Sequence, residues 1–470
     1  MKKYKKLVMF IVIILFIVSI IIVKEEQYIY EDADNFMRGK AIVKIDGKYG
    51  MIDSKGNVIL KPRYDEIDSY IGEFLRIKSN RKYGLIDWSG NIIVKPIYDE
   101  IVEVYDSELY RVRVGIKFGY IDRKGKEVVP LIYDKADLHT TGDFIGVKIK
   151  NKWGLIDKNG KVISGCKYGD IYSFNNDRVA VRINDKWGFI DKRGKILIEP
   201  IYDEVMGFHE GLSSVKINNK WGSIDKYGNM IIKPMYDGPF DFEENLAYVI
   251  SGGKYGYIDR KGNMVIEPQF YRARDFKDGI AKVRSKNYKW GYIDKRGKII
   301  IELKYDEIGY FYNGLAKVRI NCKYGYISER GDLVIGPKYD ELGYFHKGTA
   351  EIMIDNKWGI IDKSERIIIE PIYDEIDFDD GIYVVKLNNK YGLIKENGEI
   401  IVKPKFEQFG YFSENLANVK INNKWGYINR EGKFIIKPKY EDAKGFRENL
   451  APVKKKGKWA YIDTKGKKRL

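Results

Sequence analysis

The chain is poor in the residues on which most catalytic and metal sites depend. Its 470 residues include three histidines, His139, His209 and His346, and two cysteines, Cys166 and Cys322. Two cysteines are too few for a disulfide framework, and we interpret both as incidental thiols. The sequence has no nucleophile elbow, phosphate-binding loop or H-E-x-x-H pair. This inventory argues against an enzyme and predicts no catalytic residue, no cofactor-binding residue and no metal ligand.

What the chain has in abundance is a tripeptide of lysine, an aromatic residue and glycine. It recurs thirteen times at intervals of 33 to 35 residues, with Ala460 replacing the glycine in the last copy. We call the central residues the signature aromatics; they are Tyr49, Tyr83, Phe118, Trp153, Trp187, Trp221, Tyr255, Trp290, Tyr324, Trp358, Tyr391, Trp425 and Trp459. A period this steady is typical of one supersecondary unit copied along the chain.

Each copy predicts three short strands. In the copy that begins at Phe412, residues 416–421, 425–428 and 433–436 have strand character. Asn422-Asn423 suits a tight hairpin turn between the first two strands. A Tyr-Asp-x-Ile-x-x-Phe segment between copies would be either a turn or a fourth, edge strand. The sequence therefore predicts an all-β array of thirteen three-stranded units of about 34 residues.

The turn after the middle strand reads Asp-x-x-Gly in most copies. Aspartate stands four residues after the signature aromatic in ten of thirteen copies, and glycine stands three further on in twelve, with Glu365 the exception. An aspartate that accepts backbone N–H groups two residues on, and a glycine in the left-handed conformation, explain both positions. Repeated aspartates would also suit calcium, but each turn offers only one, so a structural role is favoured.

The middle strand carries the strongest packing signal. Isoleucine stands three residues after the signature aromatic in every copy, and both faces of the strand are apolar, which predicts burial between stacked sheets. We expect the glycine to leave room for a ring of the neighbouring repeat. We expect the lysine to cover the next repeat's ring with its methylene stem. The alternative for the lysines is a ladder of ligand-binding ammonium groups.

These units resemble the WG-repeat family, also called the KWG-repeat family. The likeness rests on copies such as Asn-Lys-Trp-Gly-Leu-Ile-Asp-Lys-Asn-Gly at 151–160 and Asp-Lys-Trp-Gly-Phe-Ile-Asp-Lys-Arg-Gly at 185–194. It extends over residues 31–470. The resemblance implies a β-rich repeat protein of the cell envelope or exterior, and it brings no catalytic residue with it.

Two architectures suit such an array. One is an open β-solenoid or superhelix that stacks all thirteen units end to end; the other is a pair of six- or seven-bladed β-propellers. The last unit stops at 466–470 without its third strand, and we find no matching piece at the other end to close a ring. We therefore predict the open array.

The N-terminus predicts a membrane anchor. Residues 7–23 are apolar apart from Ser19 and follow four lysines, which suits a short membrane-spanning helix with its basic flank in the cytoplasm. The predicted division is 1–23 for the basic flank and transmembrane signal anchor, 24–30 for a linker and 31–470 for the array. This places a single-pass protein in the cell membrane with the array outside. The alternative is secretion after signal cleavage, although no small-x-small cleavage pattern occurs.

For function, we expect a non-catalytic, surface-displayed module that binds or scaffolds an envelope component, namely a wall polymer, a glycan or a protein. The net charge of +17 suits an anionic partner, and a solvated surface explains it equally well. A passive spacer is the alternative; a glycan-active enzyme with carboxylates from separate repeats is a further one. We expect a monomer that binds no nucleic acid, with its variable positions in connectors such as 135–142, 204–207 and 272–275.

Overall fold

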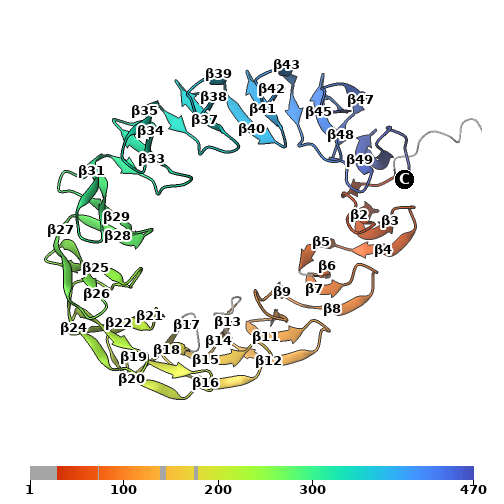
Figure 1. The fold of residues 1–470 in the computed structure, drawn as a ribbon. Helices are drawn as coiled ribbons and strands as arrows, with labels where there is room; N and C mark the ends of the chain where they lie inside the picture. Colours follow the sequence, from red (N-terminus) through yellow and green to blue (C-terminus); the bar gives the residue numbers. More distant parts are fainter. Residues whose placement is uncertain (1–28, 72, 138–143, 174–177) are drawn as a thin grey trace, which may run out of the picture. The chain divides into compact units, whose positions relative to one another are not determined.

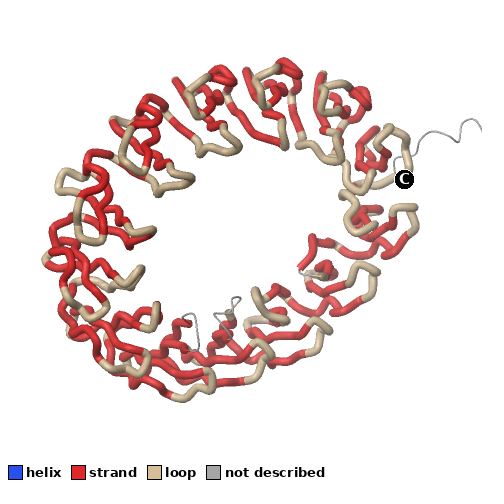
Figure 2. The backbone as a smooth tube through the Cα atoms, viewed as in Figure 1, coloured by secondary structure: helices blue, strands red, loops and turns tan. Residues whose placement is uncertain are grey.

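The computed structural model describes residues 29–71, 73–137, 144–173 and 178–470. Strands and loops make up all of this part of the chain (Figure 2), as the all-β prediction required. The chain divides into two compact units, residues 1–96 together with 372–470, and residues 97–371. No helix in the described ranges is long and apolar enough to cross a membrane. The anchor expected at 1–23 and most of the linker at 24–30 lie outside those ranges.

The described residues form thirteen antiparallel sheets, one per repeat, in which strands follow one another in chain order. The first six sheets consist of β1 Asp32–Ala33, β2 Lys40–Ile45, β3 Lys48–Asp53, β4 Val58–Tyr64; β5 Glu66–Ile71, β6 Phe74–Ser79, β7 Lys82–Ile86, β8 Ile92–Tyr98; β9 Glu100–Glu103, β10 Leu109–Val114, β11 Lys117–Asp122, β12 Glu127–Tyr133; β13 Lys135–Ala136, β14 Phe144–Ile149, β15 Lys152–Asp157, β16 Val162–Tyr168; β17 Asp170–Ser173, β18 Arg178–Ile183, β19 Lys186–Asp191, β20 Ile196–Tyr202; β21 Glu204–His209, β22 Leu212–Ile217, β23 Lys220–Asp225 and β24 Met230–Tyr236.

The remaining seven sheets continue the same order. They consist of β25 Leu246–Ser251, β26 Lys254–Asp259, β27 Met264–Phe270; β28 Arg272–Lys277, β29 Ile280–Arg284, β30 Trp290–Asp294, β31 Ile299–Tyr305; β32 Glu307–Ile308, β33 Leu315–Ile320, β34 Lys323–Ser328, β35 Leu333–Tyr339; β36 Glu341–Leu342, β37 Thr349–Ile354, β38 Lys357–Asp362, β39 Ile367–Tyr373; β40 Glu375–Asp379, β41 Ile382–Leu387, β42 Lys390–Lys395, β43 Ile400–Phe406; β44 Gln408–Phe409, β45 Ala417–Ile421, β46 Lys424–Ile428, β47 Phe434–Tyr440; β48 Asp442–Ala443, β49 Leu450–Lys455 and β50 Lys458–Asp463.

The prediction of three-stranded units is wrong for most repeats, because eleven of the thirteen described sheets have four strands. The additional strand is the connector segment, which pairs with the next strand along the chain. In the ninth sheet it is only two residues long, with Glu307 opposite Arg319 and Ile308 opposite Val318. Ile308 is buried, so one apolar side chain anchors the segment to the sheet. Within unit 97–371, these first strands lie on one side and the fourth strands on the other (Figure 1).

The core lies between successive sheets, as the two-faced apolar strand predicted. The isoleucine of the middle strand is at most 2 % exposed in all thirteen copies. In one such cluster, Tyr326, Ile335 and Tyr339 of the ninth sheet pack with Ala350 and Ile361 of the tenth. Each sheet therefore depends on its neighbour to bury its apolar face.

The signature aromatics are less buried than expected. Trp187, Trp221, Trp290 and Trp459 are buried, whereas the other nine are only half-buried. A basic side chain of the preceding strand lies over most of these rings. Lys44, for example, places its ammonium 5.1 Å from the ring centroid of Tyr49, a distance at which a cation is attracted to the ring.

The glycine of the tripeptide accommodates the backbone of its own sheet. A Cβ on Gly325 would lie 2.4 Å from the carbonyl oxygen of Ile335 and 2.8 Å from the nitrogen of Pro337, both on the fourth strand. The register of the two strands shifts at this point. The expectation that the glycine admits a neighbouring repeat's ring is therefore wrong. The last sheet, β48–β50, has no fourth strand of its own, which explains why Ala460 is tolerated there.

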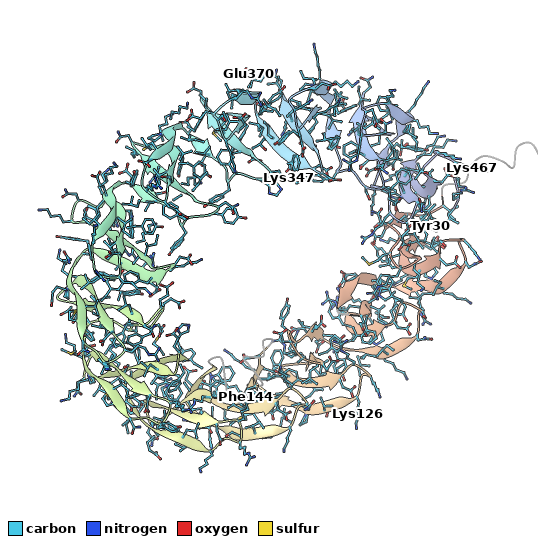
Figure 3. The ribbon with its side chains drawn as sticks, viewed as in Figure 1. Tyr30, Lys126, Phe144, Lys347, Glu370 and Lys467 are labelled. Carbon is cyan, nitrogen blue, oxygen red and sulfur yellow. The ribbon has the colours of Figure 1, made fainter. Side chains whose placement is uncertain are left out.

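The first and last repeats are joined within unit 1–96 and 372–470. Tyr30 pairs with Trp459 in an antiparallel bridge, just as Tyr440 at the end of a fourth strand pairs with Trp425. Tyr30 packs in one cluster with Phe36 and Tyr461. Figure 1 shows β49 next to β2, and Figure 3 shows Tyr30 near Lys467.

This junction corrects the predicted architecture. The open array is wrong, because residues 29–31 supply the last sheet with the end of a fourth strand, as the closing strand of a β-propeller does. The statement that no matching piece exists at the N-terminus is wrong for the same reason. Two separate propellers are not formed either, since the first repeat is joined to the thirteenth.

Candidate functional site: clefts between adjacent sheets

In most repeats the lysine of the tripeptide forms an ion pair instead of covering a ring of the next repeat; Lys254, which lies over the ring of Tyr271, is an exception. Lys48 Nζ lies 2.5 Å from Asp65 Oδ1, at the end of the fourth strand of the same sheet. Asp65 also accepts the backbone N–H of Asn80 at 2.8 Å. The ammonium of Lys48, followed by this N–H, holds the pKa of Asp65 below its usual value. Corresponding pairs in other repeats include Lys117–Asp134, Lys220–Asp237, Lys323–Asp340, Lys390–Glu407 and Lys458–Glu31.

The turn aspartates have the structural role that was predicted. Asp53 Oδ1 accepts the backbone N–H groups of Lys55 at 2.9 Å and Asn57 at 2.8 Å, and Gly56 has a φ of +87°. Hydrogen bonds from Asn57, first from its side chain, lower the pKa of Asp53. Across the described ranges, no group of three or more His, Cys, Asp or Glu side chains is placed to hold a metal ion.

The histidines and cysteines noted in the sequence do not assemble into a site. His139 lies outside the described residues. His209 Nδ1 lies 2.9 Å from the carbonyl oxygen of Phe242, and His346 lies four repeats further along. Cys166 is half-buried and Cys322 is exposed, and both are free thiols.

The variable connectors turn out to be first strands of sheets. Residues 135–136, 204–207 and 272–275 fall in β13, β21 and β28, and 138–142 lie outside the described ranges. Two carboxylates of successive connectors, Asp241 and Asp275, have raised pKa values. The surrounding protein displaces water from both and raises the pKa of each, and the negative charge of Asp241 raises the pKa of Asp275 further.

Clefts recur between adjacent sheets at equivalent positions. Between the sheets β28–β31 and β32–β35 a cleft of about 320 Å³ is lined by Tyr292, Tyr310 and Phe311. The next cleft along, of about 220 Å³, is lined by Tyr326, Tyr344 and Phe345, which occupy the same positions one repeat later. Two further clefts, of about 520 Å³ and 330 Å³, lie at corresponding places near Tyr105 and Trp88.

One variable residue borders each cleft. It is the first x of the Asp-x-x-Gly turn, and we call it the bridge position because in several sheets it reaches the preceding sheet's hairpin. The pairs it forms there are Arg260–Glu210 at 2.6 Å, Lys295–Glu244 at 3.0 Å and Arg430–Asp380 at 3.2 Å.

At other clefts the bridge position carries different chemistry. Between the eighth and ninth sheets it is Glu329, which lines the cleft together with Lys277 and Asp278, so a carboxylate stands where other repeats have the cation that pairs with the preceding hairpin. One repeat on it is Lys363, which lines the cleft with Asn313. Figure 3 shows Lys347, which also lines this cleft, on the side of the first strands, and Glu370 on the opposite side. Sequence reasoning located variability in the connectors and missed this position, although Trp88, the only tryptophan outside the tripeptides, occupies it.

Sheets copied once per repeat, with a core and a cleft between neighbours, define a β-rich repeat protein. A family model described as "WG containing repeat" matches thirteen segments of the chain, and the chain belongs to this family. The matched residues are 27–49, 49–83, 83–117, 118–153, 153–187, 187–221, 221–255, 255–290, 290–324, 324–358, 358–391, 391–425 and 425–459.

No curated protein matches the chain. Among solved structures, it is similar to BamB from Moraxella catarrhalis, with 8 % identity over 76 % of this chain and 97 % of that chain and a TM-score of 0.27. A eukaryotic initiation factor matches with 9 % identity over 63 % of this chain and 94 % of the other, at a TM-score of 0.32. Scores this low carry no argument about function.

Proposed function

We propose that this protein is a non-catalytic binding or scaffolding module and that the clefts between adjacent sheets are its binding sites. The observation that supports this is that neighbouring clefts share their aromatic lining but differ in the residue at the bridge position. The tyrosine and phenylalanine wall of the cleft at Tyr310 recurs one repeat later in the cleft at Tyr344, while the bridge position changes from Glu329 to Lys363. Repeat arrays recognise partners in this way, with variable residues displayed on a fixed scaffold.

A glycan of the cell envelope is the partner class that the clefts suit best. Tyr310 and Tyr344 are 53 % and 59 % exposed, and an exposed aromatic ring offers a flat apolar surface for a sugar ring. Carboxylate, amide and ammonium groups beside these rings would fix the orientation of sugar hydroxyls. The basic, apolar N-terminal segment is consistent with display outside the membrane.

A glycan-active enzyme is a second candidate, supported by Asp241 and Asp275. A carboxyl group with a raised pKa can serve as a general acid, and two carboxyl groups are what glycoside hydrolysis requires. The passive spacer is the third candidate. A binding module is preferred because the clefts recur along the array, whereas this carboxylate pair occurs at a single place among the described residues.

Binding to cell-wall polysaccharide fractions tests the proposal. The full-length protein is expected to bind saturably, and Tyr310→Ala combined with Tyr344→Ala should weaken binding. Tyr227→Ala is the matched control, because Tyr227 is 70 % exposed on a turn and lines none of these clefts. Absence of binding at high protein concentration would favour the spacer, and release of reducing sugar would favour the enzyme. Protection of a C-terminal tag from protease on intact cells would contradict display outside the membrane.

A further inference from the structure

The cleft at the junction of the first and last repeats differs from the others in its polar groups. It has a volume of about 330 Å³ and is lined by residues of the thirteenth, first and second sheets, all within unit 1–96 and 372–470. Two of its lining residues, Asn35 and Trp88, each carry a polar atom that is buried without a hydrogen-bond partner, namely Asn35 Oδ1 and Trp88 Nε1. A buried donor or acceptor left unpaired costs about 1–3 kcal/mol, so both atoms call for a ligand group.

Trp88 stands at the bridge position of the second sheet. At the same position of other sheets, Arg260, Lys295 and Arg430 form an ion pair with the hairpin of the preceding sheet. No such pair is possible for an indole. Arg38, on the hairpin of the first sheet, instead places its guanidinium 5.5 Å from the centroid of the Trp88 ring. The substitution therefore leaves an N–H donor and an aromatic surface at this cleft in place of a cation.

The remaining walls combine apolar and cationic groups. Met37, Ile42 and Leu75 provide the apolar surface. Three cations, Lys40, Lys444 and Arg447, line the cleft with a single carboxylate, Asp34. Lys444 Nζ lies 2.9 Å from Asp34 Oδ1, so the cleft keeps a net positive charge.

A ligand that satisfies all these groups must accept a hydrogen bond from an indole N–H and donate one to an amide oxygen. It must also present an apolar face and carry negative charge. We propose that this cleft binds a sugar unit bearing a carboxylate or phosphate group. The C–H face of the sugar lies against the apolar wall, its hydroxyls pair with Asn35 and Trp88, and its anionic group lies among the cations. This assignment deepens the proposed function and rests on it.

Calorimetric titration of the full-length protein with glucuronic acid, glucose 6-phosphate and neutral glucose tests the assignment. The two anionic sugars distinguish the carboxylate from the phosphate, and either should bind more tightly than glucose. Trp88→Phe retains a ring but removes the N–H, and Asn35→Leu removes the acceptor. Each is expected to weaken binding by about five-fold or more, since one hydrogen bond is lost. Tyr227→Ala, on an exposed turn that lines none of the clefts, should leave this binding unchanged.

The stability of the free protein provides an independent control. Because Trp88→Phe removes an unpaired buried donor, its melting temperature should be equal to or above that of the wild type, so a loss of affinity would not reflect unfolding. The assignment is overturned if no titrant binds, if glucose binds as tightly as the anionic sugars, or if both variants bind like the wild type. If the protein bound the anionic sugars at Trp88 but did not bind cell-wall fractions, the cell-wall partner would be refuted and the sugar site would stand.

Discussion

Trp459 donates its backbone N–H to the carbonyl oxygen of Tyr30 at 2.8 Å, and Tyr30 donates its own N–H back at 3.2 Å. Residues more than 400 positions apart thus pair as neighbouring strands do in the other sheets. The hydroxyl of Tyr461 extends the junction by donating to the carbonyl oxygen of Asp34 at 2.6 Å. A few residues at the N-terminus therefore complete the C-terminal sheet.

Replacement of Tyr30 by alanine should destabilise the protein through this junction. The side chain is 4 % exposed and lies in an apolar cluster, so its removal should lower the free energy of unfolding by about 3 kcal/mol. The amide of Trp459 should also exchange faster with solvent, because the backbone carbonyl at position 30 that accepts its N–H would no longer be held in place by a buried side chain. Denaturant unfolding and hydrogen exchange measure the two effects. Tyr227→Ala, on an exposed turn, is expected to change the free energy by less than about 0.5 kcal/mol, and an equal effect of both substitutions would contradict the role of the junction.

Local features of this fold could be predicted from the sequence, and long-range ones could not. The Asp-x-x-Gly turn is specified by neighbours such as Asp53 and Gly56, and the buried isoleucines follow from strand alternation. The closing segment was missed although Ile29-Tyr30-Glu31 has the pattern of Ile372-Tyr373-Asp374. Tyr30 lies one repeat before Tyr64 and is in step with the period, but its pairing partner Trp459 lies at the far end of the chain.

The clefts were missed for a related reason. Strand β32 has two residues, which is too short for any propensity to distinguish it from a turn. Without it, neither the path of the connector nor the cleft beside Tyr310 can be placed. The bridge position could have been found by aligning the thirteen turns, because its residue type varies between fixed aspartates and glycines.

Gly325→Ala should be strongly destabilising, because the new methyl group would meet the carbonyl oxygen of Ile335 at 2.4 Å. Backbone atoms cannot move aside without breaking the strand pair, so we expect a loss of about 3 kcal/mol. Gly336→Ala is the matched control, since a Cβ there meets nothing within 4 Å, and it should be close to neutral. Thermal and denaturant unfolding of the two variants decide the matter. Equal stabilities of the two variants would show that the close approach of the Ile335 carbonyl oxygen does not require glycine at position 325.

Acid should weaken the fold through its many hydrogen-bonded aspartates. The pKa values of Asp53, Asp65, Asp225 and Asp259 are lowered in the folded chain. A lowered pKa contributes stability above the unfolded value of about 3.9, and that stability is lost as the pH falls through the folded value. The urea midpoint should therefore be flat from neutral pH to about 5 and fall below about 4.

A single turn checks the origin of this acid sensitivity. Asp259→Asn keeps a side-chain oxygen for the turn, as Asn429 does when it accepts the N–H of Lys433 at 2.9 Å, but it cannot titrate. The variant should lose part of the fall in midpoint below pH 4 while remaining folded at pH 7. A pH profile that coincides with that of the wild type would assign the acid sensitivity to other groups.

Glu329→Lys should create an ion pair between the sheets β28–β31 and β32–β35, where the described residues of the wild type form none at the bridge position. Glu329 shares its cleft with Asp278, whereas Lys295 at the same position of the preceding repeat lies 3.0 Å from Glu244. A lysine at 329 would recreate that ion pair and remove a repulsion, and exposed pairs of this kind contribute about 0.2–1 kcal/mol. The gain should shrink as salt is raised from low ionic strength, because exposed charges are screened. The double substitution with Asp278→Asn is the control: it should lose the salt-dependent part of the gain, and retention of the full gain there would show that the lysine acts without Asp278.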